Sequence, residues 1–115
     1  MNTLRNKVQL IGRLGMDPEV KNFDGGKKKV NFSLATNSTY TDKTGDKIEE
    51  TQWHKIVAWG KSAETLEKFV RKGQEIAIEG KLSNRSWEDK DGNKKYITEI
   101  MVQEFLMLGK KEVQD

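Results

Sequence analysis

Apolar residues recur at every second position through most of this chain, and that period restricts the folds open to it. A period of two indicates strands that bury one face and expose the other. Residues 7–14, for example, place Val8, Leu10 and Leu14 on one side and mostly polar side chains on the other. Four further segments alternate in the same way: residues 30–36, 51–60, 75–87 and 95–108. The pattern therefore predicts five strands.

One segment has helical spacing instead. Residues 61–72 carry four apolar side chains at helical intervals, and Gly73 follows as a stop signal. These four are Ala63, Leu66, Phe69 and Val70. Three strands, one helix and two strands is the order of the OB-fold, a partly open Greek-key barrel that binds oligonucleotides, although other small α+β folds share it.

We therefore predict an all-β fold, a five-stranded antiparallel OB-fold Greek-key barrel with one helix between strands three and four. The barrel domain is expected over residues 1–110, followed by a short polar tail at residues 111–115. Pro18, the only proline, marks a turn, and residues 41–50 are expected to form a polar loop. The Asp91-Gly92 turn signal predicts that the last two strands form a hairpin.

The composition narrows the functional classes. A length of 115 residues suits one domain with one core, and the absence of cysteine excludes disulfides and Cys-ligated metals. No apolar run approaches the roughly 18 residues that a membrane span needs, and no apolar signal region follows the first basic residues. The net charge of +3, from 21 basic and 18 acidic residues, is only a mild bias toward a nucleic-acid partner.

Two tryptophans lie six residues apart in the third predicted strand, TQWHKIVAWG. The even spacing places Trp53 and Trp59 on one face, with Lys55 and Val57 between them. A buried face would not carry Lys55, and an ordinary solvent face would not carry two tryptophans. Exposed rings that alternate with cations suit single-stranded nucleic acid, because any base can stack on a ring while the cations hold the phosphates.

Two further aromatic residues fit this interpretation. Trp87 lies on a strand face that also carries Lys81 and Arg85, and Tyr40 lies at the end of the second strand. The opposite strand faces already supply an apolar set for the core: Val30, Phe32, Leu34, Ile76, Ile78 and Leu82. We therefore predict that Tyr40, Trp87 and the two tryptophans above are stacking platforms. The alternative is a subunit interface lined by the same rings.

Basic residues that could contact phosphates are spread along the chain. The candidates are Arg5, Lys7, Arg13, Lys55, Lys61, Lys72, Lys81 and Arg85. Each is also a common surface residue, so exposure without function is the alternative for each. A basic cluster at residues 27–29 could reach nucleic acid or keep a sheet edge soluble.

Signs of catalysis or metal binding are missing from the sequence. His54, the only histidine, faces away from the tryptophans, and we predict a structural role for it, with a subunit contact as a candidate. The acidic residues fall in loops beside lysines, whereas a two-metal nuclease needs converging carboxylates. There is no phosphate-cradling loop of the GxxxxGK[ST] type and no nucleophile elbow. We expect no enzymatic activity and no cofactor.

Over nearly its whole length the sequence resembles the bacterial-type single-stranded DNA-binding proteins. The segments that carry the resemblance are NKVQLIGRLGMDPEV, FSLAT, WHKIVAWGK, FVRKGQ, IEGKL with RSW, and YITEI. The resemblance implies a cytoplasmic, nucleoid-associated homotetramer of OB-folds. It would bind and protect single-stranded DNA without sequence preference during replication, recombination and repair. The family's stacking positions fall on Tyr40, Trp53, Trp59 and Trp87, and Ser83 stands where a basic residue is common.

The end of the sequence differs from the family pattern. Family members usually continue into a long Gly- and Gln-rich tail with an acidic tip that ends in Pro and Phe, whereas this sequence has no such tip. DNA binding is expected to persist, and replication and repair proteins stay possible partners, but not through docking on such a tip. Three alternatives stay open: an OB module that binds a protein partner, a nuclease or other strand-handling enzyme, and an RNA-binding protein, because stacking does not read the sugar.

Overall fold

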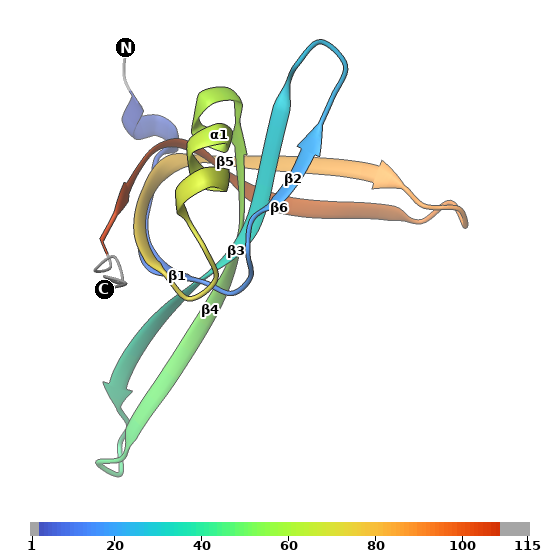
Figure 1. Ribbon diagram of the computed structural model, residues 1–115. Coiled ribbons are helices and arrows are strands. Elements are labelled where there is room, and N and C mark those ends of the chain that lie inside the picture. Colours follow the sequence, from blue (N-terminus) through green and yellow to red (C-terminus); the bar gives the residue numbers. More distant parts are fainter. Residues whose placement is uncertain (1–2, 109–115) are drawn as a thin grey trace, which may run out of the picture.

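The computed structural model describes residues 3–108, which form a β-barrel with a short helix and projecting hairpins (Figure 1). The elements in chain order are η1 (Thr3–Asn6), β1 (Val8–Leu14), β2 (Glu19–Asn22), β3 (Lys28–Thr41), β4 (Lys47–Trp59), α1 (Gly60–Phe69), β5 (Glu75–Glu88) and β6 (Lys94–Met107). The predicted polar tail, residues 111–115, lies outside the described residues.

Five of the strands close into a ring. The sheet order is β1–β5–β6–β4–β3–β2, and β1 also pairs with β3 through Arg13–Ala35 and Leu14–Leu34. The β4–β6 pair is parallel and the other pairs are antiparallel. The predicted five-stranded OB-fold barrel, with the helix between its third and fourth strands, is therefore confirmed.

The short strand β2, which starts directly after Pro18, is missing from the prediction. Residues 19–22 pair with residues 28–31 of β3 and form a hairpin at the edge of the barrel. Four residues are too few to display a period of two, and the neighbouring proline masks the strand further. Half of the polar loop expected at residues 41–50 is strand, because Thr41 ends β3 and residues 47–50 belong to β4.

The tip of the β3–β4 hairpin shows how these turns close. The Asp42 N–H donates to the Asp46 carbonyl at 2.9 Å, and the Gly45 N–H donates to the Asp42 carbonyl at 3.0 Å. Gly45 has a φ of +88°, the left-handed conformation that this turn requires. Hydrogen bonds from the Thr44 side chain and the Asp46 backbone lower the pKa of the Asp42 carboxyl. The other two hairpin tips have the same backbone hydrogen bonds and a left-handed glycine.

The core fills the barrel interior and extends beneath the helix. Its buried residues are Leu14, Val30, Phe32, Leu34, Ile56, Ala58, Ala63, Leu66, Val70, Ile76, Ile78, Ile100 and Val102. Two apolar residues of the sequence patterns are exposed: Leu82 (47%), which is predicted for the core, and Phe69 (55%), which belongs to the helical pattern and lies at the end of α1. Val70 fills the buried position next to Phe69, and Leu82 lies two residues beyond Gly80, the last residue of β5 that pairs with β1.

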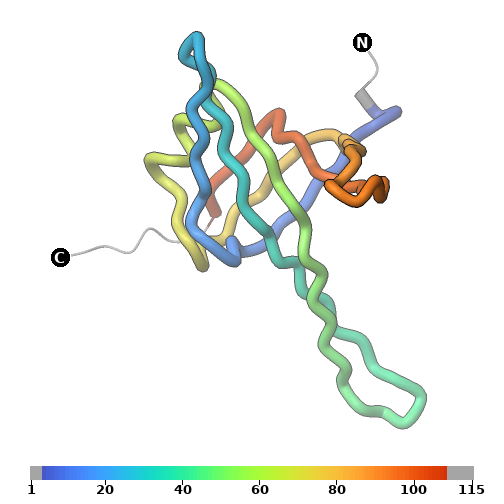
Figure 2. Tube along the Cα trace, turned by 90° about the vertical axis from the view of Figure 1, so that its right-hand side faces the viewer, coloured from blue at the N-terminus to red at the C-terminus, as the bar shows by residue number. Residues whose placement is uncertain are grey.

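The hairpins determine the outline of the molecule. The β3–β4 and β5–β6 hairpins extend well beyond the barrel in different directions (Figures 1 and 2). The radius of gyration is 16.7 Å, whereas a compact domain of about 100 residues has about 13 Å. Within residues 3–108, no helix has the length and apolar character needed to cross a bilayer.

Candidate nucleic-acid interface

The outward face of β4 carries the two tryptophans that the sequence singles out. Trp53 is 61% exposed and Trp59 is 41% exposed, and Lys55 between them is also exposed. Val57, the third residue of this row, is only 4% exposed. The face is therefore a surface with exposed rings toward its two ends and a buried valine near the second ring.

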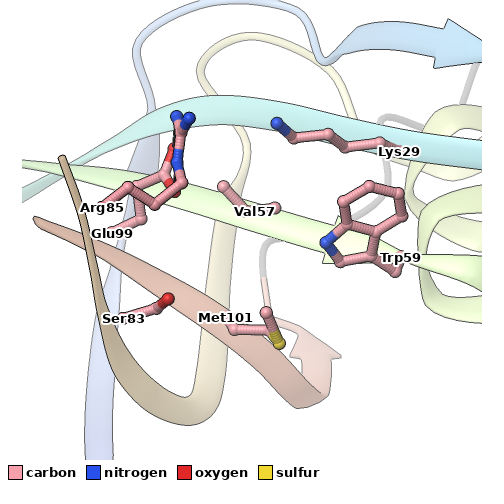
Figure 3. Close-up of a pocket in the computed structure, with 7 residues that line it drawn as sticks. All are labelled: Lys29, Val57, Trp59, Ser83, Arg85, Glu99 and Met101. Atoms are coloured by element: carbon pink, nitrogen blue, oxygen red, sulfur yellow. Dashed lines mark hydrogen bonds and ion pairs between the residues drawn. The ribbon is translucent and has the colours of Figure 1, made fainter. Parts of the chain in front are cut away.

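A shallow hollow of about 130 Å³ lies over Val57 (Figure 3). Its lining comes from β3, β4, β5 and β6: Lys29, Val57, Trp59, Ser83, Arg85, Glu99 and Met101. The strand register explains this gathering, because Lys29 pairs with Trp59 and Val57 pairs with Met101. The hollow thus combines apolar lining with one ring and two cations from strands that are distant in sequence.

Arg85 is held by Glu99 at this hollow. Its Nε donates to Glu99 Oε1 at 3.0 Å, and its Nη2 donates to Glu99 Oε2 at 3.1 Å. This hydrogen-bonded pair raises the pKa of Arg85. A guanidinium has five N–H groups, so three are left for other acceptors. The guanidinium carbon also lies 5.8 Å from the centre of the Trp87 ring, which places a cation beside a predicted stacking platform.

Trp59 is in contact with the β2–β3 hairpin. The Phe23 ring stacks on it with centroids 5.6 Å apart and an angle of 28° between the planes. The Lys29 ammonium lies 5.6 Å from the centre of the Trp59 ring. Trp59 is thus one member of a cluster that also contains Phe23, a residue absent from the predicted set.

Trp53 rests on a glycine. A β-carbon on Gly15 would lie 2.4 Å from Cζ3 and 2.9 Å from Cη2 of Trp53. The ring therefore occupies the space that a side chain at residue 15 would take. Because Gly15 supports the ring from below, it positions this platform without being part of its exposed surface.

We expect Gly15→Ala to weaken DNA binding while the protein stays folded. The added methyl group meets the far end of the Trp53 side chain, which can move by rotation, so the ring is displaced and the barrel is kept. The loss should be smaller than the about 1–3 kcal/mol that removal of a stacking ring costs. A fluorescence titration and a thermal melt test this, and unchanged affinity together with an unchanged emission spectrum would contradict the contact.

The other two predicted platforms lie on the projecting hairpins. Trp87 is 46% exposed and continues the outward row of Ser83 and Arg85 on β5. Tyr40 is 51% exposed and pairs with Ile48 far along the β3–β4 hairpin. Alternation along β3 puts Tyr40 on the local face of the ribbon opposite to Trp53. The structure therefore groups the three tryptophans on outward rows and separates Tyr40 from them.

Four of the predicted basic residues lie close to the tryptophans. Lys55 is between Trp53 and Trp59, and Lys61 follows Trp59 by two residues in the first turn of α1. Lys81 pairs with Met101 of the hollow lining, and Arg85 lines the hollow itself. These four residues place positive charges beside the exposed rings.

The remaining basic residues lie elsewhere. Lys7 forms an ion pair with Glu79 at 2.9 Å, and Arg13 donates to the Gly73 carbonyl at 3.0 Å. Arg5 is exposed in η1, and Lys72 is exposed in the loop after α1. The structure does not bring these four residues together with the hollow.

His54 lies on the other side of β4 and is half-buried. Its Nε2 is 3.0 Å from the Thr36 hydroxyl, which agrees with a structural role, and the subunit contact stays a prediction. Among residues 3–108, no group of three or more His, Asp and Glu side chains could hold a metal ion.

Three members of this surface, Glu99, Met101 and Phe23, are absent from the predicted set. Glu99 and Met101 could have been found, because they alternate with the core residues Ile100 and Val102 in the part of β6 before its register shift. No pattern in the sequence indicates the contact of Phe23 with Trp59, since the position of Phe23 depends on the unpredicted strand β2.

Comparisons with known proteins agree with this geometry. The sequence matches the family model of the Single-strand binding protein family over residues 5–108. It is 50% identical over 108 residues to "Single-stranded DNA-binding protein 1" of Xylella fastidiosa, which covers 93% of this chain and 79% of that protein. It is 49% identical over 108 residues to the protein of the same name from Chlorobaculum tepidum, covering 93% and 67% of the two chains.

Solved structures share the fold. A Plasmodium falciparum SSB in complex with ssDNA superposes with a TM-score of 0.82 at 37% identity, covering 90% of this chain and 94% of that one. A deletion mutant of the single-stranded DNA binding protein from Thermus aquaticus gives 0.79 at 32% identity, covering 92% and 51%. From the family match and these identities, we conclude that the chain belongs to the Single-strand binding protein family.

Proposed function

We propose that this protein binds and protects single-stranded DNA without sequence preference during replication, recombination and repair. The observation that carries the proposal is the outward surface on which Trp53, Trp59 and Trp87 are exposed beside Lys55 and Arg85. Stacking accepts any base because every base has a flat face, and the cations compensate the phosphates. The family acts by binding and not by catalysis.

The other predicted contacts have lesser parts in this proposal. Lys61 and Lys81 would hold phosphates at the edges of the hollow, and Tyr40 would stack a base where the DNA passes over the other face of the β3–β4 hairpin. A longer wrapped strand would also reach the more distant cations: Arg5, Lys7, Arg13 and Lys72. A cytoplasmic location beside the nucleoid belongs to the same proposal.

A tryptophan-fluorescence titration tests the proposal. An unstructured thymine oligonucleotide with deoxyribose sugars is added at low and at high salt, and the same sequence with ribose sugars measures any preference for the sugar. We expect strong quenching and an affinity that falls as salt rises. The slope of log affinity against log salt should be about −0.7 for each phosphate contact. Absence of both quenching and binding would overturn the proposal and leave the surface as a protein-binding one.

Glu99→Gln is expected to increase DNA affinity at low salt. The carboxylate places a negative charge in the hollow and occupies two N–H groups of Arg85. Without that charge, Arg85 can make a fuller phosphate contact, so the slope of log affinity against log salt should steepen by up to about 0.7. The double variant Arg85→Ala with Glu99→Gln should show no such steepening. A lower affinity in Glu99→Gln would instead show that Glu99 positions Arg85 for DNA.

We also propose that the protein is a homotetramer. Ile11 pairs with Ala77, and Ala77 pairs with Leu106, so the three side chains form an outward apolar row across β1, β5 and β6. Ile11 is 55% exposed and Leu106 is 62% exposed. Such a row, away from the tryptophans, suits contact with another copy of the chain. Sedimentation at micromolar concentration tests this, and a stable monomer would overturn it.

A further inference from the structure

We propose that Phe23 is a further base-stacking residue, and that the β2–β3 hairpin extends the DNA-binding surface beyond Trp59. The inference rests on the proposed function and adds to it a segment outside the predicted contacts. Phe23 is 43% exposed, so its ring is not a core side chain. It is also not isolated, because its ring stacks on Trp59 with centroids 5.6 Å apart.

The register of three strands explains why these rings meet. Lys21 of β2 pairs with Lys29 of β3, and Lys29 pairs with Trp59 of β4. Phe23 lies two residues after Lys21 on the same local face, and its N–H donates to the Lys27 carbonyl at 2.8 Å to close the hairpin. The outward face at the tip of the hairpin is therefore built from one aromatic ring and lysines, and at its base the Asn31 amide donates to Glu19 Oε1 at 3.2 Å.

The opposite face of the hairpin is different in character. Lys28, between Lys27 and Lys29, forms an ion pair with Glu67 of α1. Its charge is thus compensated inside the protein, on the side that faces the helix. Among the described residues 3–108, no carboxylate forms an ion pair with Lys21, Lys27 or Lys29.

The pairing of Lys21 with Lys29 points to an anion. Like charges directly opposite each other on neighbouring strands are destabilising. A phosphate between them would remove that repulsion. The same face thus offers a ring for a base and a lysine pair for the adjoining phosphate, which are the two groups of a nucleotide.

This face is continuous with the hollow. Lys29 and Trp59 both line the hollow. Lys29 belongs to the hairpin, where it pairs with Lys21, and Trp59 stacks on Phe23 of the hairpin. Figure 3 shows their side chains at the end of the hollow away from Ser83. A strand that leaves the hollow past Trp59 would meet Phe23 next. The DNA path therefore runs from the β5–β6 hairpin, across the hollow, onto the β2–β3 hairpin.

The test compares variants of Phe23 with a matched control. Phe23→Ala and Phe23→Leu remove the aromatic ring, and Phe23→Tyr keeps it. Phe69→Ala removes a phenylalanine that is 55% exposed at the end of α1, away from this face. Thermal melts establish that each variant is folded, and affinity for thymine oligonucleotides is measured over a range of salt. Phe23→Leu still fills the space against Trp59, so it serves if Phe23→Ala does not fold.

We expect Phe23→Ala and Phe23→Leu to lose about fivefold or more in affinity, without a change in the salt slope, because a base contact and no phosphate contact is lost. Phe23→Tyr and Phe69→Ala should bind like the parent protein. Lys21→Gln should lower the salt slope by about 0.7 and leave the quenching intact.

Ultraviolet cross-linking separates direct stacking from mere support of Trp59. A thymine oligonucleotide is cross-linked to the full chain and the attached peptide is sequenced, with a cross-link at Phe23 as the expected result. Parent-like affinity in Phe23→Leu, or no cross-link in the peptide that contains Phe23, would overturn the inference. If the parent protein itself does not bind the oligonucleotide, the proposed function fails, which is a distinct outcome.

Discussion

Replacing Trp53 with alanine is expected to weaken binding of a thymine oligonucleotide by about 1–3 kcal/mol while the barrel stays folded. The ring is 61% exposed, so its removal takes little apolar surface out of the core. Its inner side rests on Gly15, and its outer side is free to meet a base. A fluorescence titration gives the affinity, with Trp59 and Trp87 still present as reporters of binding.

Two comparisons make this prediction specific. Trp53→Phe keeps a ring and should retain most of the affinity, because stacking needs a flat face and not an indole. Ile56→Ala, at a fully buried position of the same strand, should instead destabilise the fold by about 2–5 kcal/mol. Unfolding of Trp53→Ala, or an affinity equal to that of the parent, would show that Trp53 is not a platform.

Much of this interface could be predicted from alternation alone. The period of two in β4 places Trp53, Lys55 and Trp59 on one face, and the structure exposes all three. The predicted face is correct because β4 is paired over its whole length with β3 without a register shift. Alternate residues of β4 therefore point to opposite faces throughout the strand.

Other features depend on geometry that the sequence does not display. Alternation assigns Leu82 to the core, but the pairing of β5 with β1 ends at Gly80 and Leu82 is exposed. Alternation also cannot show that the row of Trp59 meets Phe23, because that contact requires the register of a four-residue strand. The face of Tyr40, by contrast, follows from alternation, because β3 runs from Val30 to Tyr40 without a register shift.

The second large effect concerns stability, and we expect Gly12→Ala to destabilise the fold by about 3 kcal/mol or more. Gly12 lies where β1, paired with β5, begins to pair with β3 and so closes the barrel. A β-carbon there would lie 2.2 Å from the Ala35 carbonyl oxygen, 3.0 Å from its carbon and 3.2 Å from Leu34 Cγ. Overpacking a core usually costs about 1–3 kcal/mol, and this clash is with backbone, which cannot rotate away.

Gly15→Ala is the matched control for this prediction, since it adds the same methyl group three residues later. Its methyl group meets the tip of a side chain, whereas that of Gly12→Ala meets a carbonyl of the neighbouring strand. Denaturant unfolding should therefore show a lowered midpoint for Gly12→Ala and little change for Gly15→Ala, while DNA affinity of the folded protein falls for Gly15→Ala. An unchanged midpoint in Gly12→Ala would mean that β1 and β3 do not meet. The barrel would then be open at this seam, and the hairpins that carry Trp53 and Trp87 would lack the closed ring that fixes their directions.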